Sequence, residues 1–543
     1  MSGPGLARSG SLTFAFVVTG AGLAFGAALV VSNAAGAAAA GQFFQVVAVL
    51  AIATTLSTFG ADTGLVRSLP ALTARGQGDG VAAVLRIAAR PVLLLAAGVA
   101  ATAVLLALLP GVLPAEVGPA VLLAAPFLVL DALLNLAFGT LRGLHRVPTF
   151  SFLQNVALPS LRVAAVAAVV AAGGGLLALT AAWSVPVAAV AVAALLLLRR
   201  LLRGLGRAPG AAPPPPPDRQ RRAFWSFSSA RGVTAVVEAL LEWLDVLLVA
   251  AFLGPAAAGV YGVVNRCIRV GAMLDHTARI VTGPSISAAL AVDDHATARS
   301  VFTRTTAVLV AGAWPFYLTL LLFGPGVLAV FGEGFGSGYP AMVVIASAML
   351  LAVSAGGVQS LLLMAGRSRW QLMNKSAALA VAVALNLWLI PQWGLVGAAT
   401  AWAASVLTDT GLALFQSVRL LGISPRWSVV GATAAAAALA TGASGLTVRA
   451  LLGPGIPGLL VHGAVLGLLL AAAAAALLAR RRGAQPRHGT TAPAGGPGTT
   501  APDGGPGTTA PAAGSPGAAD RGTAETDCGP KRPRPGRDPL WSR

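Results

Sequence analysis

Apolar residues run along this chain in long segments, and a short polar stretch separates each segment from the next. A bilayer core about 30 Å thick requires roughly 20 apolar residues for one helical crossing. About fourteen segments reach that length, so the pattern predicts an all-α integral membrane protein with about 14 transmembrane helices. They lie near residues 11–32, 41–61, 81–108, 118–141, 150–172, 176–198, 225–252, 257–282, 303–323, 340–365, 371–390, 394–418, 428–448 and 457–479.

The basic residues test this count independently, because cytoplasmic loops of membrane proteins are enriched in arginine and lysine. With the N-terminus placed in the cytoplasm, almost all loop arginines fall on the inner side. The outer loops carry Glu116, Glu333 and one exception, Arg449. Abundant alanine and glycine, with arginine in place of lysine, are associated with GC-rich bacterial genomes. The sequence therefore predicts a multi-pass protein of a bacterial plasma membrane with both termini in the cytoplasm.

Similar stretches recur in the two halves of the chain at a nearly constant offset. Gly41 aligns with Gly259 at an offset of 218, and Trp183 aligns with Trp402 at an offset of 219. A pair of asparagines shares the second offset. These matches predict a duplication that makes two pseudo-symmetric six-helix lobes plus two extra C-terminal helices. Six is an even number, so both lobes have the same orientation and their pseudo-twofold axis runs along the membrane normal.

The predicted domains follow from this repeat and from local composition. Five consecutive prolines in APGAAPPPPPDRQRR favour an extended, semi-rigid arm between the lobes. The end of the chain repeats GTTAP and has too few apolar residues to fold. The predicted boundaries are 1–207 for the N-terminal lobe, 208–222 for a Pro-rich cytoplasmic linker, 223–420 for the C-terminal lobe, 421–482 for two additional transmembrane helices and 483–543 for a disordered cytoplasmic tail.

The composition separates this chain from soluble proteins. Of its 543 residues, 56% are hydrophobic and 10% are charged, with a mean hydropathy of +0.79, whereas a soluble domain is about a quarter charged. The net charge of +19 does not predict nucleic-acid binding, because the arginines lie in short loops between apolar segments. The sequence shows no P-loop, nucleophile motif or metal-ligand cluster. We therefore expect no enzyme activity, no cofactor and no metal.

One predicted membrane helix, SARGVTAVVEALLEWLDVLLVAAFLG at 229–254, carries four charged residues. At 100° per residue, these four residues fall within about 60° of one another. A charge near the bilayer centre costs at least ~2.5 kcal/mol, so the helix must face a polar environment along this stripe. The four residues of the stripe are Arg231, Glu238, Glu242 and Asp245.

The next predicted helix returns from the outer side and supplies Asn265, Arg266 and Arg269. A turn near Pro255 places Arg266 and Arg269 on either side of the depth of Glu242. Two interpretations remain open. The charges form intramembrane ion pairs that fix two helices together, or they line a water-filled cavity between the lobes. In a cavity, arginine suits phosphate because its planar donors engage oxygens in pairs, and the carboxylates hold the arginines or bind a coupling proton or cation.

Other polar residues are weaker candidates. Asp62 and Arg67 lie at the inner end of the second apolar segment, where an arginine also serves as a topology anchor. Asp131, Arg162 and Asp409 lie inside predicted spans and are candidates to face the same cavity.

Three stretches of the chain carry a family resemblance, and they are GQFFQVVAVLAIATTLSTFGADTGLVRSLP, LDVLLVAAFLGPAAAGVYGVVNRCIRV and LLMAGRSRWQLMNKSAALAVAVALNLWLIPQWGLVGAATAW. They resemble bacterial polysaccharide flippases, whose superfamily also contains multidrug and toxin extrusion exporters and the lipid II flippase. The resemblance covers roughly residues 10–480 and rests on ordered segments. It implies alternating access by two six-helix lobes, which move a lipid-pyrophosphate-linked oligosaccharide from the inner to the outer leaflet for cell-surface polysaccharide biosynthesis.

Two other functions stay open at this point. A cation-coupled exporter of small organic compounds needs exposed carboxylates, whereas a pyrophosphate needs exposed arginines, and the charged helices contain both. A non-transporting scaffold for envelope assembly has no need for charges at mid-membrane depth. The partners expected for a flippase are the lipid-linked saccharide, membrane lipids, a coupling proton or sodium ion, and a polysaccharide polymerase or glycosyltransferase.

Overall fold

The computed structural model describes residues 3–207, 209–211, 213, 216–365 and 368–483. These residues are helical apart from short connections and one isolated β-bridge between Gln77 and Arg207. All but the first position of the predicted disordered tail lies outside them. The elements are α1 Gly3–Thr58, α2 Ala61–Ala74, α3 Gly80–Leu108, α4 Val117–Gly143, α5 Val147–Phe152, the π-helix η1 Leu153–Ala157, α6 Leu158–Ala171, α7 Leu176–Arg203, α8 Pro217–Leu253, α9 Pro255–Ala291, α10 His295–Ala329, the 3₁₀-helix η2 Phe335–Gly338, α11 Tyr339–Ser354, α12 Val358–Met364, α13 Ser368–Leu421, α14 Trp427–Leu452 and α15 Ile456–Gly483.

Within the described chain, nine helices are long and apolar enough to cross a membrane. Two of these, Leu12–Thr58 and Arg369–Leu421, have 47 and 53 residues, about twice what one crossing requires. They bend at Gly36 and Gly394, whose φ angles are 75° and 56°. The charged helices α8 and α9 are not among the nine. The predicted all-α membrane fold is thus confirmed, while the number fourteen stays a prediction.

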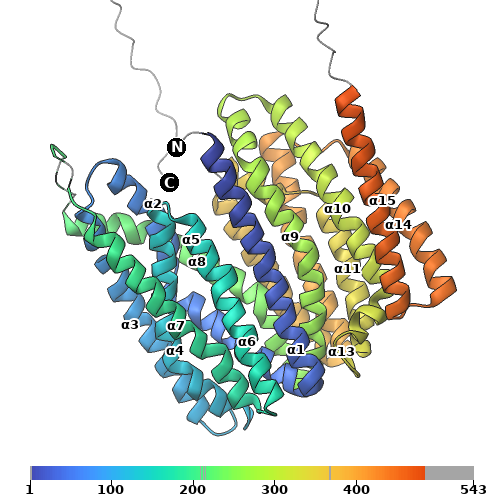
Figure 1. Ribbon diagram of the computed structural model, residues 1–543, viewed down its shortest axis with the longest axis horizontal. Helices are drawn as coiled ribbons and strands as arrows, with labels where there is room; N and C mark the ends of the chain where they lie inside the picture. The colour runs from blue at the N-terminus through green and yellow to red at the C-terminus, as the bar shows by residue number, and fades with distance from the viewer. Residues whose placement is uncertain (1–2, 208, 212, 214–215, 366–367, 484–543) are drawn as a thin grey trace, which may run out of the picture. The chain divides into compact units, whose positions relative to one another are not determined.

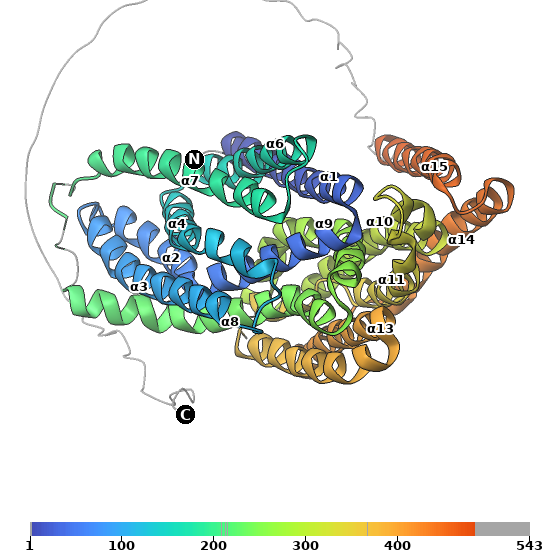
Figure 2. The same cartoon turned by 90° about the horizontal axis from the view of Figure 1, so that it is seen from below.

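The helices of the N-terminal and C-terminal halves gather on opposite sides of the compact unit Met1–Leu478. Figures 1 and 2 show α2 to α7 on one side and α9 to α15 on the other, with α1 between them. In Figure 2, α8 begins beside α3 and runs toward the other side. α1 contacts both α8 and α9, and α8 also contacts α2 and α13. Helices α1, α8 and α9 therefore connect the two halves.

The first turns of α8 pack among N-terminal helices. Phe224 is buried in a cluster with Ala61 and Leu65 of α2. The indole nitrogen of Trp225 donates a hydrogen bond of 3.2 Å to the carbonyl oxygen of Ile87 in α3. These contacts lie just beyond the predicted linker end at 222, so α8 begins in one half and continues into the other.

The crossing of α1 and α9 repeats the same contact twice. A Cβ added to Gly41 would lie 1.7 Å from the Pro255 carbonyl oxygen, and one added to Gly259 would lie 2.0 Å from the Ala37 carbonyl oxygen. These residues are paired by the predicted offset of 218. The backbone follows the repeat as well, because Gly36 (φ 75°, ψ 178°) and Gly254 (φ 85°, ψ 174°) have nearly the same conformation. Only residues without a side chain permit helices to approach so closely.

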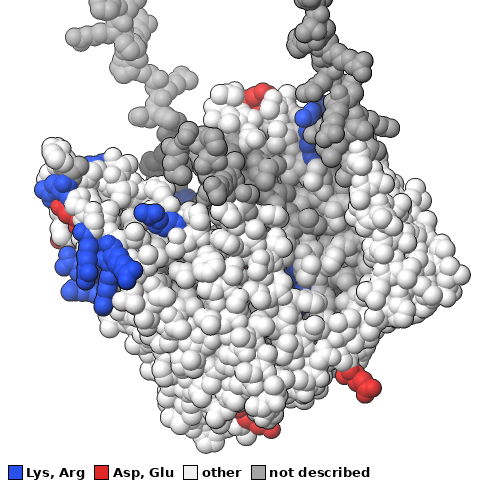
Figure 3. Space-filling model, viewed as in Figure 1, with Lys and Arg blue, Asp and Glu red and all other residues white. Residues whose placement is uncertain are grey.

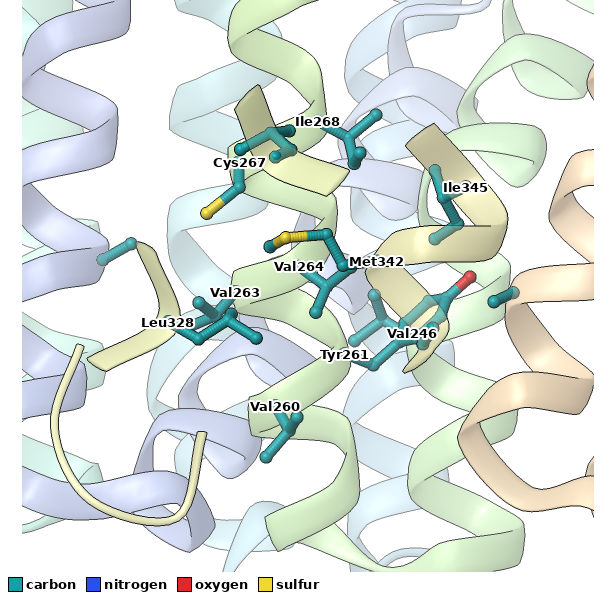
Figure 4. Close-up of a cluster of buried hydrophobic side chains, with 14 of the residues drawn as sticks. Val246, Val260, Tyr261, Val263, Val264, Cys267, Ile268, Leu328, Met342 and Ile345 are labelled. Atoms are coloured by element: carbon teal, nitrogen blue, oxygen red, sulfur yellow. The ribbon is translucent and has the colours of Figure 1, made fainter. Parts of the chain in front are cut away.

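The largest buried cluster surrounds α9. Figure 4 shows the α9 side chains Val260, Tyr261 and Val264 in one buried cluster with Met342 and Ile345 of α11. α1, α8 and α10 contribute further apolar side chains to the same cluster. This close packing fixes the position of α9, whose polar residues Asn265, Arg266 and Arg269 lie among the apolar ones.

A kink in α10 explains the single arginine of the predicted outer loops. The helix is non-helical at Phe323, and Pro325 supplies no backbone donor. The Tyr339 hydroxyl donates to the Leu321 carbonyl at 2.6 Å, and Arg449 Nη1 donates to the Leu322 carbonyl at 2.8 Å. Arg449 thus satisfies a carbonyl that the kink leaves open, which is costly inside a bilayer.

The surface charges are strongly segregated on the face drawn in Figure 3. Most of this face is uncharged, and Lys and Arg gather near the end where α7 stops and α8 starts. Acidic side chains appear at the opposite end, and others appear at the top of the view and beside the basic cluster. This arrangement is the one expected from the positive-inside rule. The arginines of this part of the chain are Arg199, Arg200, Arg203, Arg207, Arg219, Arg221 and Arg222.

Candidate functional site

Two cavities lie between the helices, and they differ in charge. The first, here called the N-cavity, has a volume of about 540 Å³ and is walled by α1, α4, η1, α6, α7, α8 and α9. Its wall is mostly apolar, with aromatic side chains that include Trp183 and Trp243. Three arginines and two carboxylates line it, and this mixture can orient an anion. They are Arg162, Arg266, Arg269, Asp131 and Glu242.

Arg266 is held in the N-cavity by neutral groups. Its Nη1 donates to the carbonyl oxygen of Gly262 at 3.1 Å, and its guanidinium carbon lies 3.6 Å from the centre of the Phe44 ring. Among the described residues, no carboxylate lies within 4.0 Å of its nitrogens. Most of its five N–H donors remain available to a ligand in the cavity.

Arg162, on α6, is held in a similar way. Its Nε donates to the Trp183 carbonyl at 3.0 Å, and its guanidinium carbon lies 4.3 Å from the centre of the Trp183 ring. In the part of the chain described here, it too forms no ion pair within 4.0 Å. Asp131, on α4, accepts a hydrogen bond from the Thr54 hydroxyl at 2.8 Å. The N-cavity therefore presents two guanidinium groups without a bonded carboxylate.

The second cavity, here called the C-cavity, has a volume of about 630 Å³, and its charges are connected. Lys375 Nζ lies 3.4 Å from Asp409 Oδ2 and 4.0 Å from Glu238 Oε1. Glu238 also accepts a hydrogen bond of 3.0 Å from Arg231, and Asp409 accepts one from Gln359. Each charged group in this row has a partner of opposite sign, so the row is already neutralised.

The pair formed by Glu242 and Arg269 lines both cavities. Arg269 Nη1 pairs with the Glu242 carboxylate, and Nη2 donates to the Glu242 backbone carbonyl at 2.8 Å. The predicted hairpin register of α8 and α9 thus brings these two residues together. Their side chains remain 45% and 41% exposed, so a ligand in either cavity can reach them.

The remaining residues predicted on α8 and α9 have different surroundings. Asp245 is buried and accepts hydrogen bonds from Asn265 Nδ2 at 3.0 Å and from the Val246 backbone at 2.8 Å. It lines neither cavity, whereas Asn265 lines the N-cavity. Arg231 lines neither cavity and reaches the C-cavity only through Glu238. The stripe read from the sequence therefore divides into cavity residues and residues that hold them.

Asp62 and Arg67 lie apart from both cavities. Asp62 forms a 2.8 Å ion pair with Arg142 of α4, and the Arg67 guanidinium lies 4.3 Å from the centre of the Phe227 ring. These contacts attach α2 to α4 and α8. Their role as substrate-binding residues stays a prediction.

Sequence reasoning missed two residues that contact Asp409, namely Lys375, which lines the C-cavity, and Gln359, which does not. Lys375 counts in the sequence as one of the inner-loop charges, yet it lies inside α13 with 14% of its side chain exposed. Gln359 of α12 gives no signal in the sequence. A signal for Lys375 does exist, because the sequence contains only one other lysine, Lys531. By contrast, Asp131, Arg162 and Asp409, the weaker candidates, do line the cavities.

An all-helical membrane fold whose two halves enclose charged cavities defines a membrane transporter. The family described as "Polysaccharide biosynthesis protein" matches residues 6–287, just over half of the 543 residues. The chain belongs to this family. It is therefore a multi-pass, flippase-like membrane transporter.

Individual relatives agree with this placement. The "Probable flippase AglR" of Haloferax volcanii is 27% identical over 178 residues, which cover 32% of this chain and 37% of that relative. The match thus spans little more than a third of the relative's length. Among solved structures, the lipid II flippase MurJ in an inward closed conformation superposes with a TM-score of 0.61 at 10% identity, over 86% of this chain and 99% of that one.

A multidrug resistance MATE family transporter of the MOP superfamily, in an inward-facing conformation, superposes with a TM-score of 0.58. It is 14% identical to this chain, and the match covers 76% of this chain and 96% of that one. At such low identity the two solved structures concern the fold alone. The three proteins are a probable flippase, a lipid II flippase and a multidrug resistance transporter.

Proposed function

We propose that the protein is an alternating-access flippase for a lipid-diphosphate-linked oligosaccharide, which it moves from the inner to the outer leaflet for cell-surface polysaccharide biosynthesis. The observation that carries the proposal is Arg266, a guanidinium that faces the N-cavity without a carboxylate partner among the described residues. Arg162 lines the same cavity and, among the described residues, likewise forms no ion pair within 4.0 Å. A diphosphate offers several oxygens to such planar donors.

The distribution of charge favours an anionic substrate over a cationic one. The N-cavity has three arginines against two carboxylates, and Glu242 is already paired with Arg269. The carboxylates of the C-cavity, Glu238 and Asp409, are occupied by Arg231 and Lys375. An exporter of organic cations would have to break these pairs before it could bind its substrate, and that costs free energy in a low-dielectric site.

Alternating access is supported by the arrangement of the helices around the cavities. Residues of both halves line the N-cavity, with Asp131 and Arg162 from the first half and Arg266 from the second. A relative movement of the halves would therefore alter the access to the site. The tight crossing of Gly41 and Gly259 lies on the predicted outer side, where it would restrict access to this route.

The proposal includes the surroundings of the protein. The bound molecules are the lipid-linked saccharide and membrane lipids, and a proton or sodium ion drives the cycle. A polysaccharide polymerase or glycosyltransferase supplies or consumes the substrate. The protein resides in a bacterial plasma membrane with both termini in the cytoplasm, and the arginines where α7 ends and α8 begins support this orientation.

The experiment is a flipping assay in proteoliposomes with a short-chain prenyl-diphosphate oligosaccharide that carries a fluorescent group. We expect the protein to expose the fluorophore to a membrane-impermeant quencher, and an excess of prenyl diphosphate to inhibit the movement. The matched neutral prenyl glycoside should be transported poorly. Efficient transport of an organic cation such as ethidium, with none of the diphosphate lipid, would establish the exporter function instead.

A further inference from the structure

Lysine is almost absent from this chain, which makes the position of Lys375 informative. Of the 37 basic residues only Lys375 and Lys531 are lysine, and the other 35 are arginine. Lys375 is also the lysine within the described helices, and it is largely buried in the C-cavity. Lysine differs from arginine in carrying a compact charge on a flexible stem, without a fork of fixed geometry. A residue that must change partners is better served by lysine.

The two carboxylates beside Lys375 do not depend on it alone. Glu238 also has Arg231 at 3.0 Å, and Asp409 also accepts a hydrogen bond from Gln359. Lys375 is 4.0 Å from Glu238 and 3.4 Å from Asp409, distances longer than a close charge-assisted hydrogen bond. The ammonium group of Lys375 can therefore move away while Glu238 keeps Arg231 and Asp409 keeps Gln359.

A third carboxylate faces the same cavity. Glu242 follows Glu238 by four residues on α8 and therefore lies one helical turn away on the same face. Its partner, Arg269, also lines the N-cavity, where Arg266 is open to an anion. Among the described lining residues, Glu242 and Arg269 are the only two that line both cavities.

We infer that Lys375 is a mobile counter-ion that links the two cavities. When the diphosphate draws Arg269 into the N-cavity, Glu242 loses its cation, and Lys375 moves from Asp409 to Glu242. Lys375 of α13 then contacts Glu242 in place of Glu238 on α8, so the contact between α13 and α8 changes whenever the N-cavity is filled. Asp409 retains its hydrogen bond from Gln359 of α12. This inference rests on the proposed function, because it requires an anionic ligand in the N-cavity. Lys375 thus has a positioning role in transport, which it performs through Glu242 and without touching the substrate.

The scarcity of lysine makes a direct experiment possible. In the full-length Lys531→Arg variant, lysine labelled with ¹⁵N at Nζ gives one side-chain signal, that of Lys375. Farnesyl diphosphate is the probe, and its binding is measured separately with a radiolabelled sample. We expect saturating farnesyl diphosphate to shift the Lys375 signal and farnesol to leave it unchanged. In Glu242→Gln the probe should still bind, but the shift should be lost because the new partner is missing.

The outcomes separate the two proposals. If farnesyl diphosphate binds and the Lys375 signal stays where it was, the counter-ion role is wrong while the proposed function stands. If farnesyl diphosphate does not bind at all, both are overturned. Transport provides a second test. Lys375→Arg keeps the positive charge but replaces the compact ammonium group on a flexible stem with a planar fork. The flipping rate should therefore fall about tenfold, with binding of the probe nearly unchanged. The matched change Lys531→Arg should leave flipping at its original rate.

Discussion

The N-cavity and the C-cavity are built at related places in the two halves but use charge in opposite ways. The repeat-related tryptophans Trp183 and Trp402 each line one of them. In the N-cavity, Arg266 and Arg162 contact carbonyl oxygens and aromatic rings. In the C-cavity, the charges are paired in a continuous row. The comparison shows that the two cavities carry tryptophans at repeat-related positions but partner their charged side chains differently. The N-cavity has arginine donors open to a ligand, whereas the charges of the C-cavity are paired with one another.

The largest expected effect is on transport, from Arg266→Ala. The loss of two charge-assisted hydrogen bonds to a diphosphate should lower the flipping rate about 100-fold. Stability should change by no more than about 1 kcal/mol, because a cation–π contact with Phe44 is lost and no ion pair is broken. Arg266→Lys should recover part of the rate, since it keeps the charge but not the fork. Flipping and thermal unfolding of the same preparations provide the measurement; an unstable Arg266→Ala protein would contradict the comparison.

The opposite result is expected in the C-cavity, where Asp409→Ala should mainly affect stability. Removing one member of a buried pair leaves a charge without its partner, which commonly costs 3–5 kcal/mol. Here Lys375 keeps Glu238 at 4.0 Å, so we expect about 2 kcal/mol, read as a lower midpoint of thermal unfolding. The double change Lys375→Met with Asp409→Leu should recover most of this loss, because Glu238 still has Arg231. If the double variant were as unstable as Asp409→Ala, the loss of stability would not come from leaving Lys375 without its partner.

The smallest effect is expected from a carboxylate outside both cavities, which sets a baseline. Asp294 precedes α10, and hydrogen bonds from the Thr297 hydroxyl and the Thr297 backbone hold its pKa below the usual value. A depressed pKa stabilises the folded state at pH above the unfolded value and loses this effect as the pH falls through the folded value. Asp294→Ala should thus be slightly destabilised at pH 7, equal to the parent in acid, and unchanged in transport. Thermal unfolding of Asp294→Ala and of the parent, at pH 7 and in acid, tests this prediction. A difference in stability that grew in acid would contradict it.

Much of the fold could be predicted from the sequence because long apolar segments and loop arginines obey strong physical constraints. The crossing of Gly41 with Gly259 could not be predicted as a contact, although both glycines were identified as repeat partners. The depth match between Glu242 and Arg269 followed from the turn at Pro255 and agrees with their observed pairing. The helical periodicity of a single segment, however, does not show which of its side chains face a cavity. Asp245 therefore belonged to the predicted stripe but is bonded to Asn265 away from both cavities.

Lys375 shows a second limit of sequence reasoning. Its charge was assigned to an inner loop, because a basic residue near the end of an apolar segment is ordinarily a topology anchor. Its partners, Glu238 and Asp409, are 137 residues before it and 34 residues after it in the chain. Contacts between residues so far apart depend on tertiary packing, which hydropathy does not encode. The useful signal was in the composition, because lysine is so rare in this chain that its position is informative.

The contacts at the crossing of α1 and α9 map onto themselves when the two halves are exchanged. Gly41 meets Pro255, Gly259 meets Ala37, and each residue of one contact is the counterpart of a residue in the other. This is the property of an isologous interface, in which one surface patch of a symmetric dimer meets its own copy. A single six-helix half that dimerised here would place one glycine against its own symmetry mate. In this chain two separate glycines, Gly41 and Gly259, meet that requirement, and neither can gain a side chain unless the backbone of the other helix moves.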